Sequence, residues 1–402
     1  MTLEITLLKF VAGRTDVMDG DECPNIRAWI NVGFIISGWE GKEELLIDKV
    51  FKVKEGWTGP GRRDALIEQL KPEDDGLHMV MGEKGIYEWW YFDAHLETGH
   101  TIVVFFHASN PNPGREGKIG VEIILLRPDG KRIQKFISYS KSDFAASKDK
   151  PDVKIGNNTI KVDMRDGELP IYEIYVKEVD IGCLLKYRAE VNGWKPGTGL
   201  SHFGDMGFFG WVIPFARASV EGTITDGDRT IQVTGIGYHD HNWLNFQFQK
   251  IINYWMWGRI YSKSFTAAYA YIQCNDKVDN HTVKVLMLAD GREVILSTGE
   301  FDFFKEDFEY NSRAKYQFPR KIVINAQNEL DATLNVKKVL EAQDMLENYN
   351  PVLRFIAKNI LRLKPGYFRL VSDFELEVTR GGKTTKEEGT TLHEIVLFKP
   401  LE

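Results

Sequence analysis

The stretch Tyr87-Glu88-Trp89-Trp90-Tyr91-Phe92-Asp93 places five aromatic side chains between two carboxylates. Because alternate side chains of an extended strand point to opposite faces, this stretch predicts a β-strand with large rings on both faces. A second stretch, Tyr238-His239-Asp240-His241-Asn242-Trp243, combines two histidines, an acid and an amide with two more aromatic residues. The two stretches lie far apart in the sequence but contain the same kinds of side chain, and we expect them to contribute to one site.

Strand patterns recur on both sides of these stretches. Apolar and polar residues alternate, β-branched and aromatic residues are frequent, and Gly, Pro, Asn and Asp mark turns between the segments. The clearest segments are residues 101–106, 120–126, 159–164, 171–176, 184–191, 218–224, 230–236, 254–261, 266–274, 283–288 and 394–398. The sequence therefore predicts an antiparallel all-β protein with little helix.

The length of 402 residues exceeds what a single hydrophobic core usually holds, so we expect two domains. A glycine-rich loop, residues 193–210, separates two runs of strands. We therefore predict one domain over residues 75–210 and a second over residues 211–402. Residues 1–74 are predicted to be an N-terminal extension that packs on the first domain.

One segment breaks the β pattern. Residues 352–363 repeat apolar side chains at intervals of three and four, and the pattern ends before Pro365-Gly366, which predicts a short amphipathic helix. Such a helix packs on the outside of a barrel, or its Arg354, Lys358 and Arg362 make a peripheral membrane contact. Both interpretations remain open from the sequence.

Composition excludes several classes of partner. The net charge of -7, with both signs interspersed, leaves no basic stripe for nucleic acid. Residues 59–61 are Gly-Pro-Gly but lack the flanking pattern of a phosphate-binding loop. Cys23, Cys183 and Cys274 have no metal-ligand spacing, and the N-terminus lacks a signal-peptide pattern. We expect a soluble cytoplasmic protein without a nucleotide.

On the two stretches quoted above, the sequence resembles the carotenoid 1,2-hydratases (hydroxyneurosporene synthases), their AttH-like relatives and the lipocalin-like Diels–Alderases. The resemblance runs from about residue 75 to the C-terminus. It implies two lipocalin-like (calycin) antiparallel β-barrels or half-barrels in tandem, with a large apolar cavity for a polyene or another long hydrophobic molecule. It also implies that His241, with Asn242-Trp243, is the counterpart of a stretch involved in catalysis, and that Glu88, Trp90 and Asp93 match the signature of the first barrel.

Chemistry on an isolated alkene sets requirements of its own. Protonation needs an acid held in a dry pocket, because burial raises the pKa of a carboxyl group. Electron-rich rings stabilise the resulting carbocation, and hydroxyl, imidazole or amide groups suffice to orient a polyene for a pericyclic reaction. The predicted catalytic residues are Glu88, Asp93, Asp240, His241 and Trp243. The predicted substrate-binding residues are Trp90, Tyr91, His202, Tyr238, Asn242, Trp255, Trp257, Arg259, Tyr269 and Tyr271.

Structural roles compete with these assignments. Trp89 and Phe92 suit core packing, and Glu88 and Asp93 equally suit hydrogen bonds to backbone amides or ion pairs with an arginine. A metal site at His239, Asp240 and His241 would need further ligands, such as His202 or Asp205, because a strand directs the two histidines to one face and the acid to the other. We predict that no metal and no other cofactor is needed.

Two functions therefore remain open. The first is a cofactor-independent enzyme that binds an isoprenoid or polyene and catalyses its cyclisation or hydration. The alternative is a non-catalytic carrier of a similar molecule. An enzyme requires an acid that faces the ligand, whereas in a carrier Glu88, Asp93, Asp240 and His241 are occupied by internal bonds, for example to Arg217 or Arg259.

Overall fold

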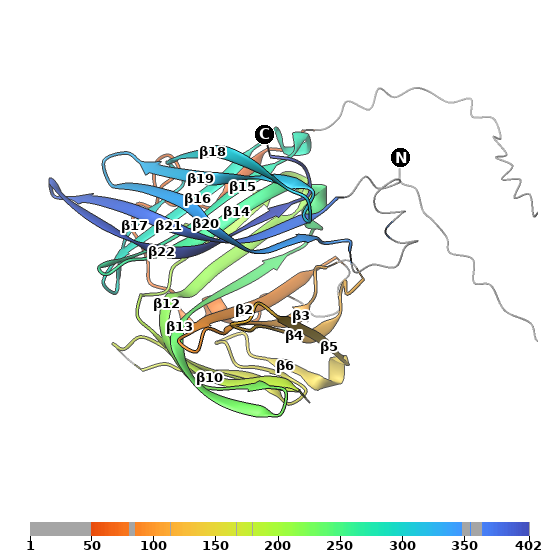
Figure 1. The fold of residues 1–402 in the computed structure, drawn as a ribbon. Coiled ribbons are helices and arrows are strands. Elements are labelled where there is room, and N and C mark those ends of the chain that lie inside the picture. Colours follow the sequence, from red (N-terminus) through yellow and green to blue (C-terminus); the bar gives the residue numbers. More distant parts are fainter. Residues whose placement is uncertain are drawn as a thin grey trace, which may run out of the picture. The chain divides into compact units, whose positions relative to one another are not determined.

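The computed structural model describes residues 50–79, 85–112, 114–165, 167–178, 180–347, 354 and 364–401. The regular secondary structure of these residues is almost entirely β-strand, as Figure 1 shows. Their only regular helices are short 3₁₀ turns, η1 (Pro72–Asp75), η2 (Lys141–Asp143), η3 (Gly204–Met206), η4 (Phe248–Lys250) and η5 (Asp276–Val278). The all-β class predicted from the period-two pattern is confirmed.

The first sheet, sheet A, has thirteen strands and forms a nearly closed antiparallel barrel, drawn in orange to green in Figure 1. Its main path runs β5-β4-β3-β2-β13-β12-β10-β9-β8-β7-β6, with β1 and β11 attached at β12. The strands are β1 (Val53–Glu55), β2 (Tyr87–Leu96), β3 (Thr101–Ser109), β4 (Ile119–Leu126), β5 (Arg132–Tyr139), β6 (Phe144–Ala146), β7 (Val153–Ile155), β8 (Asn158–Asp163), β9 (Ile171–Lys177), β10 (Ile181–Ala189), β11 (Leu200–Phe203), β12 (Phe208–Asp226) and β13 (Arg229–Leu244).

The second sheet, sheet B, has nine antiparallel strands and forms a half-barrel, drawn in teal to blue. Its order is β17-β16-β15-β14-β22-β21-β20-β19-β18, so β17 and β18 are the two edges. The strands are β14 (Ile252–Tyr261), β15 (Phe265–Cys274), β16 (Thr282–Asp290), β17 (Glu293–Thr298), β18 (Asp302–Asn311), β19 (Tyr316–Ala326), β20 (Leu330–Asp344), β21 (Gly366–Arg380) and β22 (Lys383–Leu397).

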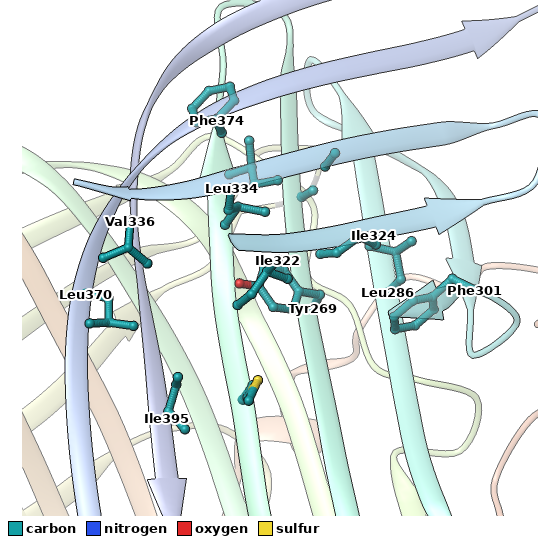
Figure 2. Packing of buried hydrophobic residues seen from close by; sticks show 14 of the residues in the cluster. Tyr269, Leu286, Phe301, Ile322, Ile324, Leu334, Val336, Leu370, Phe374 and Ile395 are labelled. Carbon is teal, nitrogen blue, oxygen red and sulfur yellow. The ribbon is translucent and has the colours of Figure 1, made fainter. Parts of the chain in front are cut away.

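Three apolar cores follow from the alternation of side chains along the strands. One fills the interior of sheet A and a second fills the interior of sheet B, part of which is drawn in Figure 2. A third contains side chains of both sheets, among them Tyr91 and Tyr238 of sheet A and Ala268 and Val285 of sheet B. The two sheets therefore pack against each other through a shared core.

The two stretches that opened the sequence analysis lie on neighbouring strands. They form the antiparallel pair β2–β13, in which Glu88 is opposite Trp243, Trp90 is opposite His241 and Asp93 is opposite Tyr238. The chain leaves sheet A after Leu244 and enters sheet B at Ile252. Strand β12, which contains residue 210, and strand β13 both belong to sheet A. The division into domains at that residue remains a prediction.

Two further expectations concern parts that the structure does not describe. Apart from Arg354, the predicted helix over residues 352–363 lies outside the described residues, as do residues 1–49 of the predicted extension. A membrane contact through that helix thus remains a prediction. No helical segment in the described part of the chain is long and apolar enough to cross a membrane.

Candidate functional site

The predicted residues on β2 and β13 divide between the two faces of sheet A. Because neighbouring side chains of a strand point in opposite directions, Glu88, Trp90, His241 and Trp243 share one face with His239. The opposite face, which packs against sheet B, carries Tyr91, Asp93, Tyr238, Asp240 and Asn242. The predicted catalytic set is thus two clusters rather than one.

His241 lies at the centre of the first cluster, between two carboxylates. Its Nε2 is 2.9 Å from Glu88 Oε1, and its Nδ1 is 3.2 Å from Asp75 Oδ1. Glu88 also accepts hydrogen bonds from the backbone amides of His78, at 2.8 Å, and Met79, at 2.9 Å. The side chains of His241 and Glu88 are fully buried.

Asp75 is shared between both histidines of β13. His239 Nε2 lies 3.0 Å from Asp75 Oδ2, and Tyr172 donates a hydrogen bond of 2.7 Å to the same oxygen. The other ring nitrogen of His239 is 2.8 Å from the carbonyl oxygen of Tyr91. Burial acts to raise the pKa of Asp75, but the charges and hydrogen bonds of His239 and His241 outweigh it and hold that pKa below its usual value.

The same network fixes the charge of His241. Burial acts to lower the pKa of its imidazole, but Asp75 and Glu88 overcome this effect and raise the pKa to about 9. At neutral pH His241 is therefore an imidazolium that donates to Glu88. Glu88 is thus occupied as the ion-pair partner of the imidazolium and as the acceptor of two backbone amides.

Stacked rings cover the first cluster. The His241 ring stacks on Trp90 with centroids 4.4 Å apart, and His78 stacks on Trp243 with centroids 3.7 Å apart. A Cβ atom at Gly210 would lie 2.1 Å from Trp243 Cε2, so this glycine provides the space for the indole. Trp243 is positioned by β12 as much as by its own strand.

The second cluster is built on an ion pair between the sheets. Arg259 of β14 donates two hydrogen bonds of 2.9 Å to the carboxylate of Asp93, to which Tyr91 donates a third of 2.8 Å. The guanidinium carbon also lies 4.4 Å from the centre of the Tyr238 ring and 5.3 Å from that of Trp257. Burial acts to raise the pKa of Asp93, but the charge of Arg259 lowers it.

Asp240 has only neutral hydrogen-bond donors around its carboxylate. Tyr238 donates at 2.8 Å, Trp211 Nε1 at 3.1 Å and Asn242 Nδ2 at 2.8 Å. Burial raises the pKa of Asp240 to about 6, although these donors act in the opposite direction. Asp240 therefore titrates closer to neutrality than an ordinary aspartate.

The remaining predicted residues lie elsewhere. Trp255, Trp257 and Arg259 alternate on β14 with residues of the sheet B interior and face sheet A. Tyr269 belongs to the interior core of sheet B, and Tyr271 packs at its margin. His202 is exposed on β11, outside both clusters.

Sequence reasoning missed Asp75, His78, Tyr172 and Trp211 as members of these clusters. Asp75 ends an acidic turn and Tyr172 lies on a distant strand, so no local pattern connects either residue with β13. Arg217, considered as a partner for the acids, pairs with Glu190 instead. The described residues contain no group of three or more His, Cys, Asp or Glu side chains placed to bind a metal ion.

Side chains fill the interiors of both sheets. Phe106 and Leu185 in sheet A, and Ile322 and Leu334 in sheet B, have no surface accessible to water. A cavity of about 10 Å³, which is room for about one water molecule, is lined by polar side chains that include Asp93 and Arg259. The interior is closely packed around these described residues, and the large apolar cavity implied by the resemblance remains a prediction.

Comparison with known proteins identifies a matching family and a curated relative of this chain. The model of the Svf1 family matches residues 88–398, well over half of the chain. A curated relative, the hydroxyneurosporene dehydrogenase of Chlorobaculum tepidum, is 25% identical over 242 residues. That match covers 51% of this chain and 61% of the relative, which is less than two thirds of the relative's length.

Three solved structures share the architecture. An AttH-like protein from Nitrosomonas europaea has a TM-score of 0.57 at 17% identity, covering 83% of this chain and 98% of its own. Kievitone hydratase from Nectria haematococca has a TM-score of 0.54 at 15% identity, and the match covers 87% of this chain and 99% of the hydratase. CghA with Sch210972 has a TM-score of 0.55 at 13% identity, and the match covers 82% of this chain and 96% of CghA. The tandem lipocalin-like fold and the resemblance to the AttH-like proteins are confirmed.

Proposed function

This chain belongs to the Svf1 family, and we propose that it binds a hydrophobic small molecule as a carrier and does not convert it by acid catalysis. The observation that carries this proposal is the state of the candidate acids. Glu88 is held by His241 and two backbone amides, and Asp93 is held by Arg259 and Tyr91. Neither carboxylate is left to protonate or polarise a ligand.

The tandem lipocalin-like fold supports the hydrophobic ligand, because such sheets enclose apolar interiors. The curated relative named for hydroxyneurosporene supports a long apolar molecule, such as an isoprenoid or a polyene. Entry of a molecule of that size requires side chains of the filled interior to move. A cytoplasmic location and independence of cofactors are parts of the same proposal.

A second function, an enzyme that cyclises or hydrates an alkene, is favoured by one observation. Burial raises the pKa of Asp240 to about 6, so about a tenth of it is protonated at pH 7 inside an aromatic layer. Tyr238 and Trp211 contact that carboxyl group and supply electron-rich rings. One of the structural neighbours, kievitone hydratase, is itself named as a hydratase.

One experiment distinguishes the two functions. The purified protein is incubated with an apolar extract of its host, and both the bound and the released molecules are identified by mass spectrometry. The Asp240→Asn variant tests the acid, and the Asp373→Asn variant, which changes an exposed aspartate of β21, is the matched control. We expect all three proteins to retain the same unaltered molecule.

Two outcomes would contradict the carrier proposal. A product that forms with wild type and Asp373→Asn but not with Asp240→Asn would establish an enzyme in which Asp240 is the acid. Failure of every protein to retain any apolar molecule would contradict binding itself.

A further inference from the structure

Among the described residues, the mainly apolar interior of sheet B contains a small group of fully buried polar side chains. Tyr269 of β15, Ser372 of β21 and His393 of β22 are all buried there, with at most 1% of their surface exposed. Figure 2 shows Tyr269 within this core, together with Ile322, Leu334 and Leu370. Polar atoms in such surroundings need hydrogen-bond partners, because an unpaired buried group is costly.

Two of these polar atoms have no partner. The Tyr269 hydroxyl makes no hydrogen bond with the described residues, and neither does His393 Nδ1. The other two tyrosines of the same core differ, since Lys305 donates to the Tyr254 hydroxyl at 2.7 Å and the Tyr316 hydroxyl donates to the carbonyl oxygen of Lys364. Of these three tyrosines of the sheet B core, only Tyr269 has an unpaired hydroxyl; in the sheet A core the hydroxyl of Tyr187 is unpaired as well.

The protonation of His393 leaves its free nitrogen able to bind a neutral group. Its Nε2 lies 2.7 Å from Ser372 Oγ, and burial lowers the pKa of the ring to about 4. The imidazole is neutral at physiological pH, so Nδ1 donates or accepts one hydrogen bond, depending on which nitrogen carries the proton. The phenol of Tyr269 is also neutral and both donates and accepts.

Gly258 lies between the two residues that carry the unpaired groups. On β14 it lies opposite Tyr269 on one side and opposite His393 on the other. A Cβ atom at this position would lie 2.7 Å from the Tyr269 hydroxyl oxygen and 2.6 Å from His393 Cβ. Both residues therefore border the space above a single glycine.

We propose that Tyr269 and His393 bind the polar group of the hydrophobic ligand, which is then an apolar molecule bearing a neutral hydroxyl or carbonyl group. This inference rests on the proposed carrier function and adds the chemistry that the carrier recognises. The apolar part packs against the aliphatic side chains of the sheet B core. Entry passes the edge strands β17 and β18, where the Phe303 ring lies 6.0 Å from that of Tyr269.

The test compares two probes that differ in one hydroxyl group. Dodecanol and dodecane are each made to compete with a fluorescent apolar dye bound to the wild-type protein, to Tyr269→Phe and to Tyr254→Phe. Loss of one hydrogen bond in a dry site corresponds to about a tenfold change in affinity. We expect wild type and Tyr254→Phe to prefer dodecanol about tenfold, and Tyr269→Phe to bind both probes equally.

A thermal melt separates ligand binding from a structural role. Since the Tyr269 hydroxyl has no partner, Tyr269→Phe should melt at or above the wild-type temperature, whereas Tyr254→Phe, which loses the bond to Lys305, should melt lower. Unchanged preference for dodecanol in Tyr269→Phe, or equal binding of both probes by wild type, would overturn the inference while leaving the carrier function intact. Failure of wild type to bind either probe would contradict the carrier function itself.

Discussion

At the scale of single residues, His241 is unusual because it is a cation enclosed by protein. Burial of a charge is expensive unless partners and hydrogen bonds compensate for it. Here Glu88 and Asp75 on either side of the ring provide that compensation, while Asp75 also accepts a hydrogen bond from Tyr172 and contacts His239 Nε2. The cluster is thus a compensated set of charges that joins the turn at Asp75 to β2 and β13.

This arrangement predicts how stability depends on pH. A histidine whose pKa is raised in the folded state stabilises the fold fully below its unfolded pKa, and that contribution is lost as pH rises through the folded pKa. For His241 the window runs from 6.5 to about 9. The free energy of unfolding should fall by up to about 3 kcal/mol across it, which denaturant titrations at a series of pH values will measure.

The Glu88→Gln variant tests whether this pH dependence comes from His241. Removing one carboxylate lowers the pKa of the imidazole, so the variant should be less stable at pH 7 and lose less stability between pH 7 and pH 9. Glu388→Gln, at an exposed position of β22, is the control and should follow wild type. An equal pH slope in all three proteins would rule out the buried imidazolium.

At the scale of elements, β12 provides the space that the Trp243 ring of the first cluster occupies. Gly210 faces Trp243 across the β12–β13 pair, and the indole occupies the space that a side chain would need. Gly210→Ala should displace this ring and separate it from His78, at a cost of about 1–3 kcal/mol for overpacking. Thermal melts and tryptophan fluorescence measure both effects.

Ser219→Ala is the matched control for this change, because Ser219 is exposed on the same strand. It should shift neither the melting temperature nor the emission by a comparable amount. If Gly210→Ala melts and emits like wild type, the Trp243 ring does not depend on the glycine.

The strands were predictable from the sequence because alternation is a local property. The similar composition of the two aromatic stretches linked them, but their pairing as neighbouring strands of one sheet was not predicted. The division of the predicted site residues into two clusters was not predictable from the sequence. Alternation shows that His239 and His241 share a face, but which face meets sheet B depends on packing against strands far away in the sequence. Asp75 and Tyr172 joined the site through such long-range contacts, and the unpaired Tyr269 hydroxyl is visible only once its neighbours are known.

At the scale of the whole described molecule, a shared core and at least two ion pairs connect the two sheets, namely Asp93–Arg259 and Arg132–Glu341. The core contains residues of β2 and β13 as well as β14, β15 and β16. Within that layer Asp93 and Arg259 are paired with their side chains about 95% buried. Because the two sheets share this layer, we expect them to unfold together in a single cooperative transition.

Breaking the pair tests this coupling. Asp93→Asn leaves the Arg259 charge buried without its counter-ion, which should destabilise the protein by about 3–5 kcal/mol, whereas Asp93→Leu combined with Arg259→Met should recover most of that loss. Asp290→Asn breaks an exposed pair with Arg380 in sheet B and should cost less than about 1 kcal/mol. Circular dichroism and tryptophan fluorescence, followed through the same denaturant titration, should report one shared midpoint for each variant. If the two signals separate in Asp93→Asn, the sheets are stable independently and the ion pair contributes only to docking.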